Sequence, residues 1–350
     1  MPEKDICQIP VLVRQGALEE LVSLLQKTAP RAQKILLVTD RTVGALYAKN
    51  LTDLLSATGK PILLQEIPCG EAGKQLSSLT EILKRLTREH FSRFDLVLAL
   101  GGGCVCDTAA LAASLYQRGM CLVLLPTTLL CAVDAGIGGK TAINFGGIKN
   151  QIGSFYLPDA VLCDTRLLCT LPPEEMKNGY AEIIKCTALF DAALFSALQQ
   201  TPLKEMELSG LISFSIHCKR RLASQDLHDL GQRRLLNFGH TLGHAVEQLS
   251  HFEIPHGHAV SIGMVLITRA LESLPGYAQT ADRLAEVLKK NGLPVQTVYS
   301  ADELVQAAAA DKKRCGDQIT LAALPDFGQG TLIPLSLSDL RARLARILSV

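Results

Sequence analysis

The chain has 350 residues, of which 48% are hydrophobic and 20% are charged, and its formal net charge is +1. This length exceeds one typical core and predicts two domains, while the near-neutral charge without a basic block argues against a nucleic-acid partner. Eleven cysteines, no signal peptide and no apolar run long enough to span a bilayer lead us to expect reduced thiols in a cytoplasmic protein without a membrane segment.

The N-terminal half alternates short apolar runs with helical patterns. Four runs are typical of buried strands: 35–38, 62–64, 96–100 and 122–125. Apolar residues at helical spacing between Leu76 and Leu86 predict a helix between two of them. Such alternation indicates an α/β domain with a Rossmann-like, mostly parallel sheet, in which ligands bind beyond the carboxyl ends of the strands. We assign this domain to residues 1–170.

Two loops follow predicted strands in this half. Gly101–Asp107 contains three glycines and precedes an apolar helix predicted over 108–116. Its glycines could let a pyrophosphate approach the backbone at a helix N-terminus, although the glycine spacing is incomplete and an ordinary turn fits the pattern equally well. The second loop, Pro126-Thr-Thr128, ends the next strand with two hydroxyls.

After Pro172-Pro173 the pattern favours helices alone. Apolar residues three and four apart follow positions 181, 211, 259, 281, 301 and 337, and prolines separate several of these runs. We therefore predict an all-α domain over 171–350 that binds metal and substrate, with the active site in the cleft between the two domains.

The C-terminal half also concentrates the histidines. Five of the eight lie between positions 240 and 258, and His240 and His244 are four apart, so a helix would project both from one face, as in helix-borne metal sites. His256 follows Pro255. Glu182 is the candidate carboxylate ligand, with Lys185 one turn further on. The alternatives are solvated histidines and an ordinary surface ion pair between Glu182 and Lys185.

Several cations lie near glycine turns or near these metal candidates. Lys140 and Lys149 are flanked by glycines, a setting that solvated surface lysines explain less well. Such cations suit a substrate that carries phosphate and carboxylate groups. The set comprises Lys140, Lys149, Lys185, Lys219, Arg233, Lys312 and Lys313.

Motifs along nearly the whole chain are similar to those of one known family. They include Gly70-Glu-Ala-Gly-Lys74, Gly101-Gly-Gly-x-x-x-Asp107, Pro126-Thr-Thr-Leu-Leu130, Ala181-Glu-Ile-Ile-Lys185, Asn237-Phe-Gly-His-Thr-Leu-Gly-His244, His256-Gly257 and Asp311-Lys-Lys313. The chain resembles the 3-dehydroquinate synthase family, within the sugar-phosphate cyclase superfamily. The resemblance implies conversion of 3-deoxy-D-arabino-heptulosonate 7-phosphate to 3-dehydroquinate and phosphate in the shikimate pathway of aromatic amino acid and chorismate biosynthesis. The implied steps are transient oxidation by NAD, phosphate elimination, reduction, ring opening and aldol closure.

The resemblance also implies roles for individual residues. The zinc ligands would be Glu182, His240 and His256, with His244 facing the substrate instead. NAD would bind at Asp40, Glu71, Lys74, Gly103, Asp107, Thr127, Thr128, Asp134, Lys140, Lys149, Thr170, Leu171 and Glu175. The substrate would bind at Lys140, Asn150, Lys185, Lys219, Arg233, Asn237, His244 and Lys312 or Lys313, with Arg118 reaching its phosphate from the second subunit of a homodimer. Of these, Lys140, Lys185, Asn237 and His244 would be catalytic.

The chain departs from the family pattern at a few positions. His258 replaces a usual Glu two residues after His256, where we expect it to orient that ligand, the alternative being that its side chain points to solvent. Ala135-Gly136, Cys106 and Leu227 are the other departures, and none removes an implied ligand. A cyclase acting on another sugar phosphate, a metal-dependent polyol dehydrogenase that consumes NAD, and a catalytically silent homologue are the alternatives. The many cations disfavour the dehydrogenase, and the complete ligand set disfavours the silent homologue.

Overall fold

A computed structural model describes residues 5–311 and 318–348 of the chain. The chain divides into two compact units, Met1–Pro172 and Pro173–Val350, a division close to the boundary predicted after residue 170. Among the described residues, no helix has both the length and the apolar character needed to cross a membrane.

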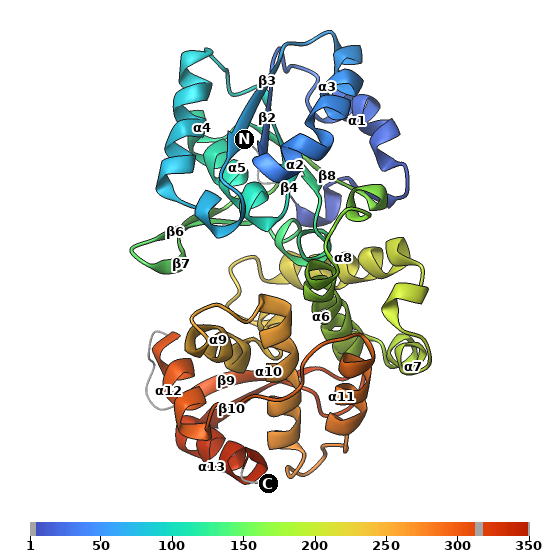
Figure 1. Ribbon diagram of the computed structural model, residues 1–350, viewed down its shortest axis with the longest axis vertical. Coiled ribbons are helices and arrows are strands. Elements are labelled where there is room, and N and C mark those ends of the chain that lie inside the picture. The colour runs from blue at the N-terminus through green and yellow to red at the C-terminus, as the bar shows by residue number, and fades with distance from the viewer. Residues whose placement is uncertain (1–4, 312–317, 349–350) are drawn as a thin grey trace. The chain divides into compact units, whose positions relative to one another are not determined.

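The N-terminal unit is built on a six-stranded sheet in which every neighbouring pair is parallel (Figure 1). The strand order is β1-β8-β5-β4-β2-β3. The strands are β1 (Val11–Arg14), β2 (Ile35–Asp40), β3 (Ile62–Ile67), β4 (Leu96–Gly101), β5 (Cys121–Pro126) and β8 (Ala160–Asp164). Strands β2, β4 and β8 are buried along their whole length, which explains their continuous apolar sequences. The predicted parallel α/β class is confirmed.

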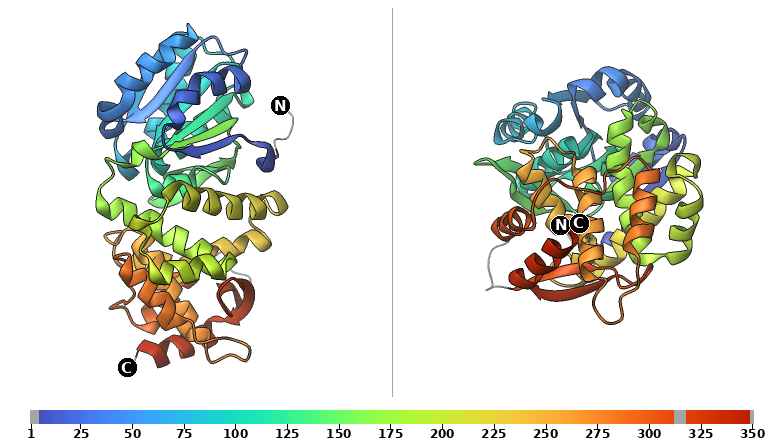
Figure 2. Two further views of the ribbon diagram at one scale, coloured as in Figure 1. Left: turned by 90° about the vertical axis from the view of Figure 1, so that its right-hand side faces the viewer. Right: turned by 60° about the horizontal axis from the view of Figure 1, so that its bottom comes forward.

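Helices lie on both faces of this sheet, as the side view in Figure 2 shows. They are α1 (Leu21–Thr28), α2 (Arg41–Val43), α3 (Lys49–Leu55), α4 (Leu76–Arg88) and α5 (Gly103–Leu115). Leu21 and Leu25 of α1 and Leu55 of α3 pack with alternate residues of the central strands, such as Leu37 and Leu98. Helix α5 packs on β4 and β5. A separate antiparallel hairpin, β6 (Lys140–Phe145) and β7 (Ile148–Phe155), completes the unit.

Two details of this unit differ from the sequence-based prediction. Helix α5 begins at Gly103, so residues 103–107 of the expected loop are its first turns, because the glycines there allow the chain to enter the helix directly after β4. The prediction also omitted β1 and β8, whose apolar runs were usable signals, and β6 and β7, whose mixed polar sequences give weak strand signals.

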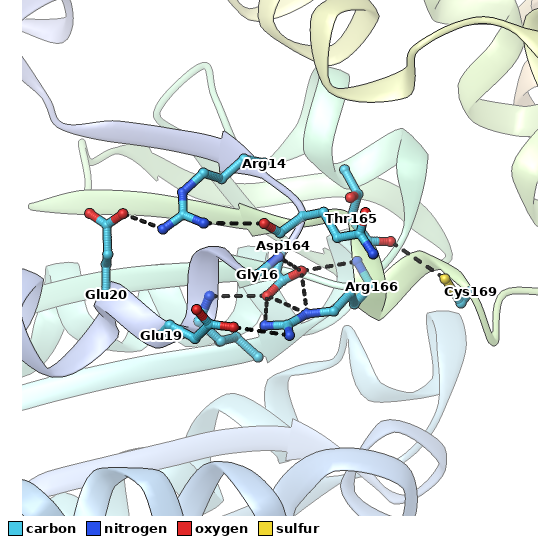
Figure 3. A network of polar contacts seen from close by, with 10 residues as sticks. Arg14, Gly16, Glu19, Glu20, Asp164, Thr165, Arg166 and Cys169 are labelled. Carbon is cyan, nitrogen blue, oxygen red and sulfur yellow. Dashed lines mark hydrogen bonds and ion pairs between the residues drawn. The ribbon is translucent and has the colours of Figure 1, made fainter.

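One buried carboxylate joins both ends of the N-terminal unit's sequence. Asp164, at the end of β8, accepts hydrogen bonds from the backbone N–H groups of Gly16 and Leu18 and pairs with the Arg166 guanidinium at 2.9 Å (Figure 3). Burial alone would raise the pKa of Asp164, but Arg166 and these N–H groups lower it below its usual value. The ionised carboxylate therefore holds the turn after β1 against the end of β8.

The C-terminal unit is mostly helical. Its helices are α6 (Pro173–Phe190), α7 (Ala192–Gln200), α8 (Leu208–Gln225), α9 (His240–Leu249), α10 (His256–Leu271), α11 (Ala281–Lys290), α12 (Ala301–Asp311) and α13 (Leu337–Leu348). An antiparallel hairpin of β9 (Gln318–Ala323) and β10 (Thr331–Ser336) departs from the all-α prediction. Strand β9 is only six residues long, and so short an apolar run does not distinguish a strand from a buried helix by periodicity.

Candidate active site

Three helices of the C-terminal unit bring the predicted metal ligands together. Glu182 lies within α6 and is only 2% exposed, whereas His240 and His256 are the first residues of α9 and α10. Helix α10 packs against both α6 and α9. Because each histidine begins its helix, the contact between α9 and α10 fixes both imidazoles relative to the carboxylate.

Glycines allow α9 and α10 to approach this closely. Gly239, the residue before α9, has φ of +78°, a conformation that side chains disfavour. A Cβ on Gly263 of α10 would lie 2.0 Å from the Gly239 carbonyl oxygen, closer than any real contact. The two backbones therefore touch next to His240.

The ligand atoms converge on one oxygen of Glu182. Glu182 Oε1 lies 3.5 Å from His240 Nε2 and 3.7 Å from His256 Nε2, and one ligand atom from each of the three residues lies within 4.8 Å of the others. This buried oxygen has no hydrogen-bond partner among the described residues. Such an oxygen is costly unless an ion or a donor satisfies it, so the carboxylate and two imidazoles fit a divalent metal.

The remaining nitrogens of both imidazoles face hydrogen-bond acceptors. His240 Nδ1 lies 3.2 Å from the carbonyl oxygen of Phe238, and His256 Nδ1 lies 3.3 Å from Glu247 Oε2. A carbonyl or an ionised carboxylate can only accept, so each Nδ1 donates a proton to it. Each Nε2 is therefore the nitrogen that faces Glu182 and can supply a lone pair to a bound metal.

Lys185 and Glu182 form a buried ion pair, so the alternative of an ordinary surface pair is wrong. Burial alone would raise the pKa of Glu182, but the charges of Lys185 and His240 hold it well below its usual value. Burial and the Lys185 charge lower the pKa of His240. Burial would also lower the pKa of His256, but Glu182 and Glu247 raise it to about 10. The site therefore keeps its carboxylate ionised and favours positive charge between Glu182 and Glu247.

His244 lies beside the metal candidates. Its ring centroid is 5.5 Å from that of His240 and 6.1 Å from that of His256. His244, Glu247 and His256 form a second group with metal-compatible spacing, which shares His256 with the first. The predicted helical pairing of His240 and His244 is thus present on α9.

The expected role of His258 beside His256 is wrong. His258 Nε2 lies 3.6 Å from Glu174 Oε2, and the hydrogen-bonding position next to His256 belongs to Glu247. His258 is two residues after His256 on α10, and side chains two positions apart on a helix point in different directions. Sequence reasoning missed Glu247, although its place two turns after His240 on the same helix face was a usable signal.

The implied substrate cations of this unit lie on neighbouring elements. Lys219 on α8 and Arg233 on the short helix η10 (Gln232–Asn237) are buried, and η10 ends at Asn237. Arg233 Nη1 donates to the carbonyl oxygen of Leu227 at 2.7 Å. Helix α8 packs against both α6 and η10. Leu227 thus contributes its backbone, while Lys312 and Lys313 lie outside the described residues.

In the N-terminal unit, implied NAD residues form contacts around the start of α5. Lys74 and Asp107 form a largely buried ion pair of 2.5 Å. Burial alone would lower the pKa of Lys74, but the Asp107 charge raises it above its usual value. Glu71 Oε2 accepts a hydrogen bond of 2.5 Å from Asn144 Nδ2. These contacts join the turn after β3, helix α5 and the β6–β7 hairpin.

The other implied NAD residues of this unit lie at or after strand ends. Asp40 ends β2, and its carboxylate accepts hydrogen bonds from the backbone N–H groups of Thr42 and Val43. Thr127 and Thr128 follow β5. Thr170 Oγ1 lies 2.6 Å from Tyr47 Oη. Gly103, Asp134, Lys140, Lys149 and Leu171 also lie in this unit, as do Arg118, Asn150 and the variant positions Cys106, Ala135 and Gly136. Glu175 lies in the C-terminal unit, on α6.

Comparisons with known proteins agree along the chain. Residues 64–178 match the family described as 3-dehydroquinate synthase N-terminal, and residues 179–314 match 3-dehydroquinate synthase C-terminal. The chain is 41% identical to a 3-dehydroquinate synthase of Lactiplantibacillus plantarum over 98% of this chain and 96% of that protein. A 3-dehydroquinate synthase of Pyrococcus furiosus is 37% identical over 91% and 93%.

Solved structures share the fold. The 2-epi-5-epi-valiolone synthase ValA of Streptomyces hygroscopicus subsp. jinggangensis, with NAD+ and Zn2+ bound, superposes with a TM-score of 0.87 at 26% identity, covering all of this chain and 98% of that one. A 2-deoxy-scyllo-inosose synthase, complexed with carbaglucose-6-phosphate, NAD+ and Co2+, gives 0.86 at 22% identity and 96% coverage of each chain. A probable glycerol dehydrogenase of Sinorhizobium meliloti gives 0.63 at 15%, with 97% and 96% covered.

The two cyclases superpose more closely than the dehydrogenase does, so the fold with its glutamate–histidine cluster places the chain among the sugar-phosphate cyclases. Within this class, both family matches and the relatives found by sequence are 3-dehydroquinate synthases. The chain belongs to the 3-dehydroquinate synthase family, and its function is that of a 3-dehydroquinate synthase in the shikimate pathway.

Proposed function

We propose that the chain performs this reaction with a divalent metal, zinc by preference, and with NAD as a cofactor that is regenerated in each turnover. The observation that carries the proposal is the buried Glu182 Oε1, which lies between two imidazole nitrogens and lacks a hydrogen-bond partner among the described residues. A bound divalent metal would polarise the substrate hydroxyl that is to be oxidised. The bound metal and NAD of related cyclases support the proposal.

Residues of this chain would hold the substrate from both sides of its reacting carbons. Lys185, Lys219 and Arg233 are buried cations, which suit carboxylate and phosphate groups because guanidinium and ammonium donors bind anions strongly in a dry environment. His244 lies next to both histidine ligands, and we assign it, with Asn237, to proton transfer at the substrate. Lys140 and Asn150 of the hairpin would complete the substrate contacts.

NAD would bind at the carboxyl ends of the parallel strands. The glycines before α5 leave backbone N–H groups at a helix N-terminus, which suits a pyrophosphate. Lys74 and Asp107, held together by their ion pair, would fix the shape of this edge. We expect Glu175, at the start of α6, to contribute to the nucleotide contacts.

We further propose a cytoplasmic homodimer in which Arg118 reaches the phosphate bound to the other subunit. Arg118 is exposed on a short helix, η6 (Tyr116–Arg118), and its φ is +63°. Non-glycine residues in this region are uncommon and often mark functional positions. All cysteines among the described residues are free thiols, which supports a reducing compartment.

Phosphate release tests the proposed function. The purified protein is mixed with 3-deoxy-D-arabino-heptulosonate 7-phosphate and substoichiometric NAD, and phosphate, 3-dehydroquinate and NADH are measured together. We expect phosphate and product in equal amounts. Product from a hexose phosphate alone would indicate another cyclase, and accumulation of NADH in proportion to substrate would indicate a polyol dehydrogenase.

A further inference from the structure

Glu247 occupies a buried position that the proposed reaction does not yet use. It lies on α9, about two turns after His240, and it is 6% exposed. Its Oε2 atom lies 3.3 Å from Nδ1 of His256, which begins the neighbouring helix α10. Burying a carboxylate is costly unless it is paired, so its contact with a candidate metal ligand on another helix suggests a function for Glu247.

The two nitrogens of His256 face two different carboxylates. Nε2 lies 3.7 Å from Glu182 Oε1, whereas Nδ1 lies 3.3 Å from Glu247 Oε2. An imidazole with its Nδ1 proton directed at a carboxylate has one tautomer and one ring rotation, and its Nε2 lone pair then faces the opposite side. Here that side is the one occupied by Glu182.

The backbone of His256 is fixed separately. The N–H of Gly257 donates to Asn178 Oδ1 at 3.0 Å, and a Cβ on Gly257 would lie 2.5 Å from Asn178 Cα. The start of α10 is thus docked on α6 whatever residue occupies position 247. Removing the Glu247 carboxylate would therefore release the rotation of the imidazole while leaving the helix in place.

We propose that Glu247 is the positioning residue of the metal site, fixing the tautomer and orientation of His256 so that Nε2 faces the ion. This inference rests on the proposed metal site. His240 is oriented by a backbone carbonyl, that of Phe238, so Glu247 is the side chain through which substitution can test this kind of contact. Losing a carboxylate that orients a ligating histidine typically lowers metal affinity by about 10- to 100-fold.

Glu247 could instead be a ligand, because His244, Glu247 and His256 also have metal-compatible spacing. An ion between Glu247 and His256 would occupy Nδ1. It would leave Glu182 Oε1, which lacks a hydrogen-bond partner among the described residues, still unsatisfied. The geometry therefore favours positioning over ligation.

Metal binding, measured without substrate, tests this role. Glu247→Gln and Glu247→Ala are compared with the wild type and with Glu253→Gln, which removes the same charge from an exposed loop position nearby. Zinc affinity is measured by competition with a chromophoric chelator, and Co2+ absorption reports the ligand set. The unfolding midpoint of each apoprotein separates stability from binding.

We expect Glu247→Ala to bind zinc about 10- to 100-fold more weakly, with an unchanged Co2+ band pattern. Glu247→Gln should lie between Ala and the wild type, because its amide oxygen still accepts from Nδ1 without the charge. Glu253→Gln should bind as the wild type does. If Glu247→Ala fails to fold, the Gln variant carries the test.

Zinc affinities within twofold of the wild type in folded Glu247 variants would overturn the inference, whatever their apoprotein stability. A changed Co2+ spectrum would also overturn it, by making Glu247 a ligand. A wild type that binds no metal would overturn the proposed metal site as well, so the two failures are distinguishable.

Discussion

The close contact between α9 and α10 predicts that Gly263→Ala lowers both the stability and the activity of the protein. Replacing Gly263 by alanine would place a Cβ 2.0 Å from the Gly239 carbonyl oxygen and 2.7 Å from the Gly243 nitrogen. Both are backbone atoms, so no side chain can rotate away. Real Cβ contacts essentially never fall below 3.0 Å. The two helices must therefore move apart locally by about 1 Å.

Two effects set the size of the change in stability. Overpacking of this kind costs about 1–3 kcal/mol, while alanine gains about 0.5–1 kcal/mol over glycine within a helix. We therefore expect Gly263→Ala to lower the free energy of unfolding by about 1–2 kcal/mol. Because His240 begins α9 next to Gly239, the same displacement should move it away from His256, and a 1 Å misplacement can cost about 100-fold in rate.

Urea unfolding and steady-state kinetics measure both effects. The matched control is Gly210→Ala on the exposed side of α8, where the added Cβ meets only the carboxylate end of Glu207. It should change the free energy of unfolding by less than about 1 kcal/mol and leave activity unchanged. Wild-type stability and activity in Gly263→Ala would refute the argument that the two backbones touch at this point.

Three further predictions concern the metal, the second subunit and the Asp164 network. Chelation should abolish activity and zinc or cobalt should restore it, so full activity in a rigorously metal-free sample would refute the metal site. Arg118→Ala mixed with Lys185→Ala should regain activity through hybrid dimers, and no recovery in verified heterodimers would exclude a shared site. Asp164→Asn should lower the free energy of unfolding at pH 7 by about 2 kcal/mol. The folded-state pKa of Asp164 is lowered, so its contribution to stability is present above about pH 4 and is lost as the pH falls further. The difference in free energy of unfolding between the wild type and Asp164→Asn should therefore shrink in acid. A difference that does not change with pH would contradict this reasoning.

The local pattern of the sequence predicted three of the interior strands, although it missed β8, which is buried along its whole length. The runs at 35–38, 96–100 and 122–125 became β2, β4 and β5, because central parallel strands must be apolar throughout. The hairpin of β9 and β10 escaped prediction, since Pro334 interrupts β10 and the apolar run of β9 does not by itself distinguish a strand from a buried helix. The start of α5 at Gly103 was missed for a related reason, because glycine is a weak helix signal.

The candidate site was only partly predictable. The spacing of His240 and His244 indicated a shared helix face, and the structure places both on α9. The approach of His256 to Glu182 depends on the packing of α10 against α6, which no local pattern contains. Glu247 was missed because its partner lies on another helix, and His258 was misassigned because proximity in sequence to His256 does not give proximity to its ring.

The position of the bound ion shows whether Glu182, His240 and His256 hold the metal. A crystal of the zinc-loaded protein, measured on both sides of the zinc absorption edge, gives an anomalous difference map that places the metal without reference to activity. We expect one peak coordinated by Glu182 Oε1, His240 Nε2 and His256 Nε2. A peak between His244, Glu247 and His256, or no peak near Glu182, would contradict this expectation.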